Sequence, residues 1–550
     1  MIYINCRIID VFLLLGLMCA IGYNSVYAKA SCSGKNKRYV VSEIIDLKGK
    51  ELSLPAKTVL VFKGCGKFVN GRVSGKNIKI VSGNHYVFAS NVTTYFEETK
   101  LRSNWFECLY ACIIDNRKCK IIISEGNYII NNKPYAKITN SLIGEGEVRI
   151  KHISPFSVGD EVLIDGISWD GQDKANYWMY CQPNHLIIRN CTFQNYYGKS
   201  AGIIYWSHSE RDTDGLIIEN CTFGRLGAKE NGVVGDMDGS TAVIYTYRCK
   251  NIEIRNNKFT NQFGEEDSDA IKLEGIRVSS SVYPKDEHEI YVYSDINARI
   301  ERNVFINVPK SPIKLFASRV IVRNNKMTYN NRVKTALARV FNGRNLIIER
   351  NKAICNNGIS NVVEVLSCKN VCLYKNRVES TDKEEYAFGE LIKIENSNDI
   401  CVDKMNIFIS SSSRTDVNQT LVRLSGRDIK IRDSNIKAPY TYYGIYAPFG
   451  VIGLTVENSG FSVNSGIQHL LLVNNTVSDA KGKCIIMNSV FNASSQKINS
   501  ATSYGAIFAH EILVDDCRFN YDKEITLNAD NVDVKRSRAS RFNIQQRGIK

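Results

Sequence analysis

The sequence predicts a parallel β-helix, a solenoid in which the chain passes through short strands once per coil. A nine-residue phrase, N-I-E-I-R-N-N-K-F at Asn251–Phe259, recurs about fourteen times, with some weaker copies. Within it Ile252 and Ile254 alternate with Glu253 and Arg255, which is the period of a strand. The clearest copies begin at residues 297, 319, 345, 370, 399 and 428, so they are 22 to 29 residues apart. A period in the twenties without helical patterning indicates stacked coils, each of which buries its apolar side chains against its neighbours.

Alignment of the copies produces two columns that support this fold. The ninth position is often phenylalanine, whose stacked rings would fill the core. The seventh position is most often asparagine, and stacked amides can hydrogen-bond along the axis. We therefore expect a structural ladder, with Cys191, Cys221 and Cys517 as packed thiols within it. The column consists of Cys191, Cys221, Asn257, Asn303, Asn325, Asn351, Asn376, Met405, Ser434, Ser459, Asn475, Ser489, Cys517 and Ser537.

On these residues the chain resembles the right-handed parallel β-helix proteins of the pectin lyase-like superfamily. The resemblance covers roughly residues 120–545. It implies an all-β, right-handed parallel β-helix of roughly fourteen coils that follows an N-terminal cap. The repeat is specific for a fold and says little about function, because one fold hosts many activities.

The N-terminal region predicts export. Residues 1–30 read as a signal peptide, in which Arg7 precedes the short apolar stretch Val11–Ile21 and Ala28-Lys29-Ala30 offers a cleavage site. That stretch is too short to span a bilayer, and no other stretch predicts a transmembrane segment. We expect a secreted, periplasmic or cell-surface protein after cleavage near Ala30. Residues 31–119 are predicted to be the cap and opening segment, and residues 120–550 the β-helix.

Composition limits the partners. The formal net charge is +15, which favours an anionic partner such as an acidic glycan. No nucleic-acid-binding motif occurs, and no cofactor is expected. Cys108, Cys112 and Cys119 lack a histidine at ligand spacing, so no metal site is predicted. The oligomeric state and the pairing of the 17 cysteines stay open.

A second strand in each coil carries a column of outward side chains. In a β-helix, equivalent positions lie about 4.8 Å apart along the axis, so neighbouring cations would repel one another. A polyanion along the column would relieve this repulsion, and tyrosines at its ends could stack on sugars. Replacement of Lys314 and Arg339 by Gln is then expected to leave the melting temperature equal or slightly higher. The column consists of Tyr205, Tyr245, Lys272, Lys314, Arg339, Glu364, Lys393, Arg423 and Tyr446.

Carboxylates cluster where this column's cations begin. Asp267, Asp269 and Lys272 lie in G-E-E-D-S-D-A-I-K-L-E-G, and Asp238 precedes the second strand of the preceding coil. Glycoside hydrolysis needs two carboxylates, one acting as the acid and the other as base or nucleophile. The stretch also resembles the Asn-Thr-Asp-Gly-Ile-x-Ile strand of the polygalacturonase family, with Asp269 at that motif's aspartate. The next coil departs from that family, because Pro309-Lys310-Ser311-Pro312 replaces an adjacent aspartate pair.

A lyase reaction is an alternative chemistry. Lys314 and Arg339 are one coil apart in the column, which is similar to the alginate lyase and chondroitinase B family. That resemblance implies a lysine base and a cation that neutralises a uronate carboxylate. The sequence thus predicts an exported carbohydrate-active protein that cleaves an acidic polysaccharide as a hydrolase or lyase. The alternative is a non-catalytic glycan-binding or cell-surface protein, since no complete catalytic motif is present.

Overall fold

The structure is a computed structural model that describes residues 38–197, 202–206, 211–226, 242–262, 269–278, 292–308, 310–381, 388–410, 419–439, 441–463, 469–474, 482–493 and 505–546. Successive coils pair in parallel, which confirms the predicted right-handed parallel β-helix.

The density of contacts within the chain divides it into two units. The first ends at Phe193 and the second begins at Gln194, except that Asn176–Trp178 belongs to the second. The expected signal peptide lies outside the described residues, and no described helix is long and apolar enough to cross a membrane.

The first unit already contains coils in the segment that was expected to be a cap. Its strands pair in parallel in three small sets: β1 (Arg38–Val41), β4 (Val59–Phe62) and β7 (Lys79–Val81); β2 (Ile44–Asp46) and β5 (Lys67–Val69); β3 (Glu51–Ser53), β6 (Gly71–Lys76) and β8 (Val92–Glu97). The short helices η1 (Ser103–Trp105) and α2 (Leu109–Ile114) follow β9 (Lys100–Arg102), and α2 packs against β8 and β10 (Lys120–Ile130). The unit continues through β11 (Ala136–Ile138), β12 (Ser141–His152), β13 (Phe156–Val158), β14 (Leu163–Asp165), β15 (Ser168–Asp170), β16 (Met179–Tyr180) and β17 (Leu186–Arg189).

A buried histidine at the end of β12 predicts acid sensitivity of the first unit. His152 is fully covered, packs against Phe156 and Trp169, and its Nδ1 lies 3.0 Å from the carbonyl oxygen of Ser154. Burial lowers the pKa of His152 from 6.5 to about 4, although Ser154 and Asp170 act in the opposite direction. The unfolded chain therefore binds more protons between these two values, so the stability of the unit falls as pH drops through this window.

The expected loss is about 3 kcal/mol once the pH falls below the folded value. Unfolding midpoints measured at pH 7 and pH 4.5 should differ more for the wild type than for His152→Gln. An identical pH dependence in both proteins would contradict this origin.

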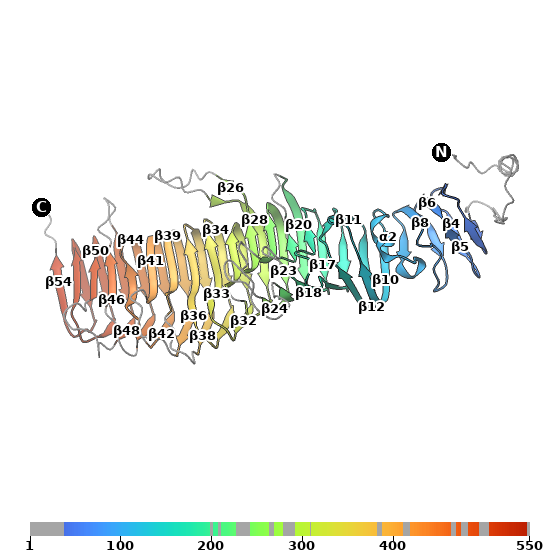
Figure 1. The fold of residues 1–550 in the computed structure, drawn as a ribbon. Coiled ribbons are helices and arrows are strands. Elements are labelled where there is room, and N and C mark those ends of the chain that lie inside the picture. Colours follow the sequence, from blue (N-terminus) through green and yellow to red (C-terminus); the bar gives the residue numbers. More distant parts are fainter. Residues whose placement is uncertain are drawn as a thin grey trace. The chain divides into compact units, whose positions relative to one another are not determined.

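In the second unit most coils pass through three strands, and equivalent strands of successive coils stack in parallel (Figure 1) to form three faces. In two coils a single long strand, β39 or β41, covers both the first and the second face. The first face consists of β19 (Ile204–Tyr205), β22 (Ala242–Tyr247), β25 (Asp269–Glu274), β30 (Ser311–Phe316), β33 (Val333–Phe341), β36 (Ile359–Leu366), β39 (Glu390–Asp403), β41 (Thr420–Arg432), β43 (Tyr443–Ala447), β46 (His469–Asn474), β49 (Gly505–Phe508), β52 (Ile525–Ala529) and β54 (Phe542–Gln546). The second face consists of β20 (Thr213–Glu219), β23 (Cys249–Arg255), β28 (Asp295–Glu301), β31 (Ser318–Arg323), β34 (Arg344–Glu349), β37 (Lys369–Tyr374), the later parts of β39 and β41, β44 (Val451–Glu457), β47 (Lys483–Met487), β50 (Glu511–Asp515) and β53 (Asn531–Lys535). The third face consists of β21 (Thr222–Leu226), β24 (Lys258–Gln262), β29 (Val304–Ile306), β32 (Lys326–Tyr329), β35 (Lys352–Cys355), β38 (Arg377–Ser380), β40 (Asn406–Ile409), β42 (Asn435–Ala438), β45 (Gly460–Val463), β48 (Val490–Ala493) and β51 (Arg518–Asn520).

The corner between the second and third faces explains why asparagine is frequent at the sixth position of the nine-residue phrase. The sixth residue of the phrase turns the chain in the left-handed region, with φ of 55° at Asn256, 56° at Arg302 and 56° at Asn324. Asparagine tolerates this conformation better than most residues. The seventh side chain then enters the core, where the predicted ladder begins.

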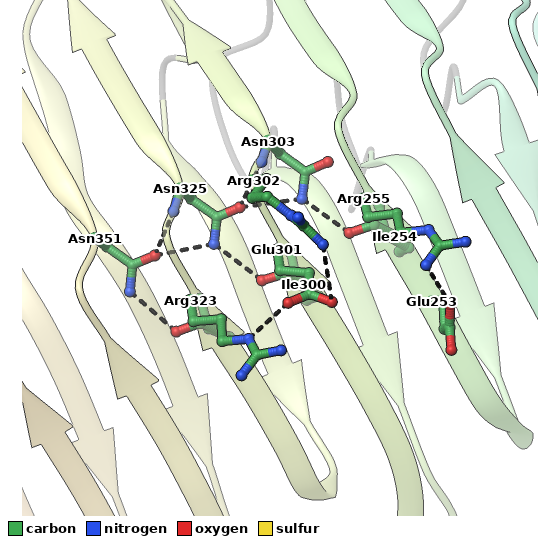
Figure 2. Close-up of polar contacts among 11 residues, drawn as sticks. Glu253, Ile254, Arg255, Ile300, Glu301, Arg302, Asn303, Arg323, Asn325 and Asn351 are labelled. Carbon is green, nitrogen blue, oxygen red and sulfur yellow. Dashed lines mark hydrogen bonds and ion pairs between the residues drawn. The ribbon is translucent and has the colours of Figure 1, made fainter.

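The asparagine ladder is confirmed, and Figure 2 shows three of its members. The Asn325 Oδ1 accepts the Asn303 backbone N–H at 2.9 Å and the Asn303 side-chain amide at 3.1 Å. The Asn325 amide donates in turn to the Ile300 carbonyl at 3.0 Å and to Asn351 Oδ1 at 2.9 Å. Serine hydroxyls replace the amides from Ser434 onward and accept the backbone N–H of the preceding coil. The copy that begins at His469 was wrongly aligned, because β46 (His469–Asn474) pairs with β43 (Tyr443–Ala447) and β49 (Gly505–Phe508) on the first face, and the Ser459 N–H donates directly to Ser489 Oγ. Asn475, which that copy placed in this column, itself lies outside the described residues.

The phenylalanine column stacks as predicted. Phe259 lies between Phe223 and Phe305, with ring centroids 5.0 and 4.9 Å away and interplanar angles of 11° and 8°. A second stack joins Phe491 to Phe461 and Phe519, each at 5.0 Å. Cys221 and Cys517 are buried thiols of the second unit, and Cys191 is one of the first unit, as expected.

The outward side of the second face carries side chains of alternating charge. Glu219, Arg255, Glu301, Arg323 and Glu349 lie in register on five successive coils, and we call them the charge ladder. Arg255 contacts Glu219 at 2.8 Å. Arg323 contacts Glu301 at 2.6 Å, as Figure 2 shows. The arginines are about one-third exposed, so each pair contributes at most about 1 kcal/mol to stability.

Candidate functional site

The nine outward residues of the first face stand opposite one another, as their alignment predicted. Tyr205 pairs in register with Tyr245, which pairs with Lys272, and Lys272 pairs with Lys314. The register then continues through Arg339, Glu364, Lys393, Arg423 and Tyr446. We call these nine residues the outward column. Asp238 and Asp267, which were also predicted as catalytic residues, lie outside the described residues.

Asp269 and Lys314 form a buried pair at the centre of this face. Asp269 begins β25, and Ser311, opposite it in register, donates its hydroxyl hydrogen bond to the Asp269 carboxylate. Lys314 Nζ lies 3.8 Å from Asp269 Oδ2, and the two side chains are 7% and 0% exposed. Since Asp269 is covered, the geometry favours a role in orienting Lys314 over direct contact with a substrate. Its predicted catalytic role stays a prediction.

A second ion pair occupies the next positions of the column. Arg339 Nε donates to Glu364 Oε2 at 2.7 Å, with side-chain exposures of 12% and 8%. Their strands, β33 and β36, are neighbours in the stack. Glu364, the one carboxylate of the aligned column, is thus the partner of one of its cations.

The other cations of the column also have carboxylate partners. Lys272 lies 3.9 Å from Glu274, and Lys393 lies 3.8 Å from Glu395. Arg423 contacts Glu395 at 2.6 Å and Glu390 at 3.2 Å. The expectation of mutually repelling cations is therefore wrong, because five cations meet five carboxylates. The expectation for the Lys314 and Arg339 double variant has therefore lost its premise and stays untested, since the variant would leave Asp269 and Glu364 without these charged partners.

Aromatic rings cover the column at its Tyr205 end. The Tyr205 ring lies between Tyr177 and Tyr245, with centroid distances of 5.1 and 4.8 Å and tilts of 47° and 41°. Tyr245 is only 3% exposed, which corrects its expected role as an open sugar platform. Its hydroxyl lies 3.1 Å from Glu274 Oε2, and burial together with this carboxylate raises the pKa of Tyr245 far above its usual value. Tyr245 is therefore a hydrogen-bond donor and remains protonated at neutral pH.

The Arg423 end of the column is more accessible. Exposure of the cationic side chains rises from 7% at Lys314 to 25% at Arg423. Tyr446 and Phe449 flank the Arg423 guanidinium, with ring centroids 5.8 and 5.9 Å from Cζ. The Tyr443 ring stacks on Tyr446 at 3.9 Å, and Phe449 is 71% exposed. This end presents aromatic surface beside a charge to solvent.

Several residues of this face were missed by the sequence analysis. Glu274 and Glu395 lie two positions after Lys272 and Lys393, and the period of a strand puts such residues on the same side. Phe316 and Phe341 have the same relation to Lys314 and Arg339, and their rings stack at 4.8 Å. Extension of the column alignment by two positions would have revealed all four.

Among the described residues, no group of three or more His, Cys, Asp or Glu could hold a metal ion.

Comparison with known proteins yields weak structural likenesses. No protein-family profile and no curated protein sequence matches the chain. A PL6 alginate lyase in complex with a trisaccharide is 13% identical, with 78% of this chain and 85% of that chain covered and a TM-score of 0.40. The catalytic domain of a GH87 alpha-1,3-glucanase in complex with tetrasaccharides is 14% identical, with 70% and 62% covered and a TM-score of 0.36. A mutant tailspike protein of E. coli bacteriophage HK620 in complex with a pentasaccharide is 12% identical, with 90% and 74% covered and a TM-score of 0.27.

Proposed function

We propose that this chain is an exported carbohydrate-active protein that binds a polysaccharide along the outward column and cleaves it beside Lys314 and Arg339. The observation that carries the proposal is the pair of buried ion pairs, Lys314–Asp269 and Arg339–Glu364, on neighbouring coils. Burial of charge is unfavourable unless the partners are well oriented. Such clusters are concentrated at functional sites, where oriented charges act on a substrate.

The accessible aromatic residues support a sugar as the ligand. The rings of Tyr446 and Phe449 can pack against a sugar. The Arg423 guanidinium between them can donate hydrogen bonds to the hydroxyl or carboxylate groups of that sugar. A chain bound there could extend along the column toward Arg339. The net charge of +15 supports an acidic polysaccharide, although five carboxylates, four of them outside the outward column, balance the column's five cations.

Product analysis distinguishes the possible functions. The full-length protein would be incubated with a panel of acidic and neutral polysaccharides, and binding, reducing ends and the absorbance of unsaturated uronates would be measured. New reducing ends without that absorbance indicate a hydrolase, and reducing ends with it indicate a lyase. Binding without products from any polysaccharide would reject the catalytic part and favour a glycan-binding protein. Absence of binding to every polysaccharide would reject the proposal.

Phe449→Ala is expected to weaken polysaccharide binding about three- to tenfold, because it removes one stacking surface. Phe408→Ala is the matched control, since Phe408 is a 40% exposed ring near Lys437 on the third face. Titration calorimetry with a polysaccharide that the wild type binds should show a weaker affinity only for Phe449→Ala. Equal affinities in both variants would place the binding surface elsewhere.

A further inference from the structure

Two cysteines stand side by side on the outward side of the second face. Cys372 of β37 and Cys401 of β39 are register partners on neighbouring parallel strands. Both are partly exposed, whereas Cys368, near the start of β37, is buried. The same column continues to Ile347 on one side and Lys430 on the other. The two thiols therefore lie at the surface and outside the outward column of the first face.

The backbone geometry suits a bond between these two thiols. Register partners on adjacent parallel strands are about 4.8 Å apart, and their side chains point to the same side of the sheet. Disulfides occur at Cα separations of roughly 4.4–6.8 Å. Closure thus requires rotation of the two side chains and no rearrangement of the coils.

The surroundings activate one of the two thiols. The hydrogen bond from the Cys372 thiol lowers the pKa of Cys401 to about 7, and Arg432 and Lys430 act in the same direction, against burial and Asp403. The same interaction raises the pKa of Cys372 well above its usual value, with burial and Asp403 adding to it and Arg432 opposing. By contrast, burial raises the pKa of Cys368 and of Cys484 to about 12. Cys401 is therefore the more readily ionised of the two thiols, and the thiolate is the reactive form.

We propose that Cys372 and Cys401 are a redox-active dithiol site that closes to an intramolecular disulfide by exchange with a small-molecule or protein disulfide. The Cys401 thiolate attacks one sulfur of the incoming disulfide, and the other sulfur leaves as a thiolate. The Cys372 thiol then loses its proton and attacks the Cys401 sulfur of the mixed disulfide, which releases the second thiolate. Two electrons pass from the cysteine pair to the incoming disulfide, whose two sulfurs leave as thiols once protonated.

The order of these steps follows from the hydrogen bond. While Cys401 is a thiolate, it accepts a hydrogen bond from the Cys372 thiol and so raises the pKa of Cys372. Once Cys401 is part of a mixed disulfide, its negative charge is gone, so Cys372 becomes easier to deprotonate. The pair thus gains its second nucleophile only after the first step.

The test uses the full-length protein and oxidised glutathione at pH 7. Peptide mass spectrometry after alkylation should show a linked peptide pair containing Cys372 and Cys401, loss of alkylation at both cysteines, and full reversal by dithiothreitol. Cys372→Ser keeps a hydroxyl donor beside Cys401 and should accumulate one glutathione on Cys401. Cys401→Ser should react at least about tenfold more slowly at Cys372, since the thiolate is lost. Cys65→Ser, at an exposed single cysteine of the first unit, should form the linked pair as the wild type does.

Absence of the linked peptide in wild-type protein that is glutathionylated at Cys65 would overturn the proposal. So would equal rates for the two single variants. If either variant does not fold, the wild-type peptide pair decides the question by itself. Glycan binding and cleavage do not enter this readout, so its outcome is independent of the proposed function.

Discussion

Asn325→Ala is expected to lower the free energy of unfolding by about 3–5 kcal/mol. The side chain accepts two hydrogen bonds from Asn303 and donates one each to Ile300 and Asn351 (Figure 2). Alanine would leave the Asn303 backbone N–H and side-chain amide without this acceptor in a core position that is 1% exposed. Buried polar groups without partners are more costly than the average hydrogen bond is stabilising.

Urea denaturation followed by circular dichroism would measure this loss. Asn492→Ala is the matched control, because Asn492 accepts a 2.6 Å hydrogen bond from Asn520 at an exposed position. It should change stability by less than about 0.5 kcal/mol. If both variants lose the same free energy of unfolding, burial does not explain how the asparagine ladder stabilises the protein.

Arg339→Met is expected to lower the free energy of unfolding by about 3–5 kcal/mol, because it leaves the Glu364 carboxylate buried without its cation. Both side chains are less than one-seventh exposed, so solvent screens the pair only slightly. The double variant Arg339→Met with Glu364→Leu should recover most of the loss, since it removes both charges and keeps apolar volume.

A double-mutant cycle of these variants gives the coupling energy. Lys437→Met provides the control, because Lys437 lies near the exposed Phe408 on the third face and should change stability little. Additive effects of Arg339→Met and Glu364→Leu would show that the two side chains do not depend on each other. This result would also restore the expectation that the column tolerates loss of its cations.

The fold was predictable because two periods in the sequence constrain the same geometry. Alternation along Asn251–Phe259 determines which side chains enter the core, and the spacing of its copies determines which residues meet on successive coils. The asparagine ladder and the phenylalanine stacks follow from that alignment alone. The order of the outward column from Tyr205 to Tyr446 could be read in the same way.

The environment of the column could not be read from the alignment. Alternation fails at the start of β25, where Asp269, Ala270 and Ile271 are buried in succession, so Asp269 lies within reach of Lys314. An outward position is also not the same as an exposed one. Tyr245 and Lys314 are covered by aromatic and charged neighbours, including Tyr205 and Phe316, whose positions depend on packing between coils.

The charge ladder of the second face has a consequence for how such a chain can change in length. Because charges alternate from Glu219 to Glu349, the number of coils between two of these side chains decides whether they attract or repel. Loss of the single coil that carries Glu301 would place Arg255 beside Arg323. Loss of two coils would place Arg255 beside Glu349 and keep opposite charges together. On this face, duplication or deletion in steps of two coils is therefore expected to preserve the contacts between opposite charges, whereas a step of one coil brings like charges together.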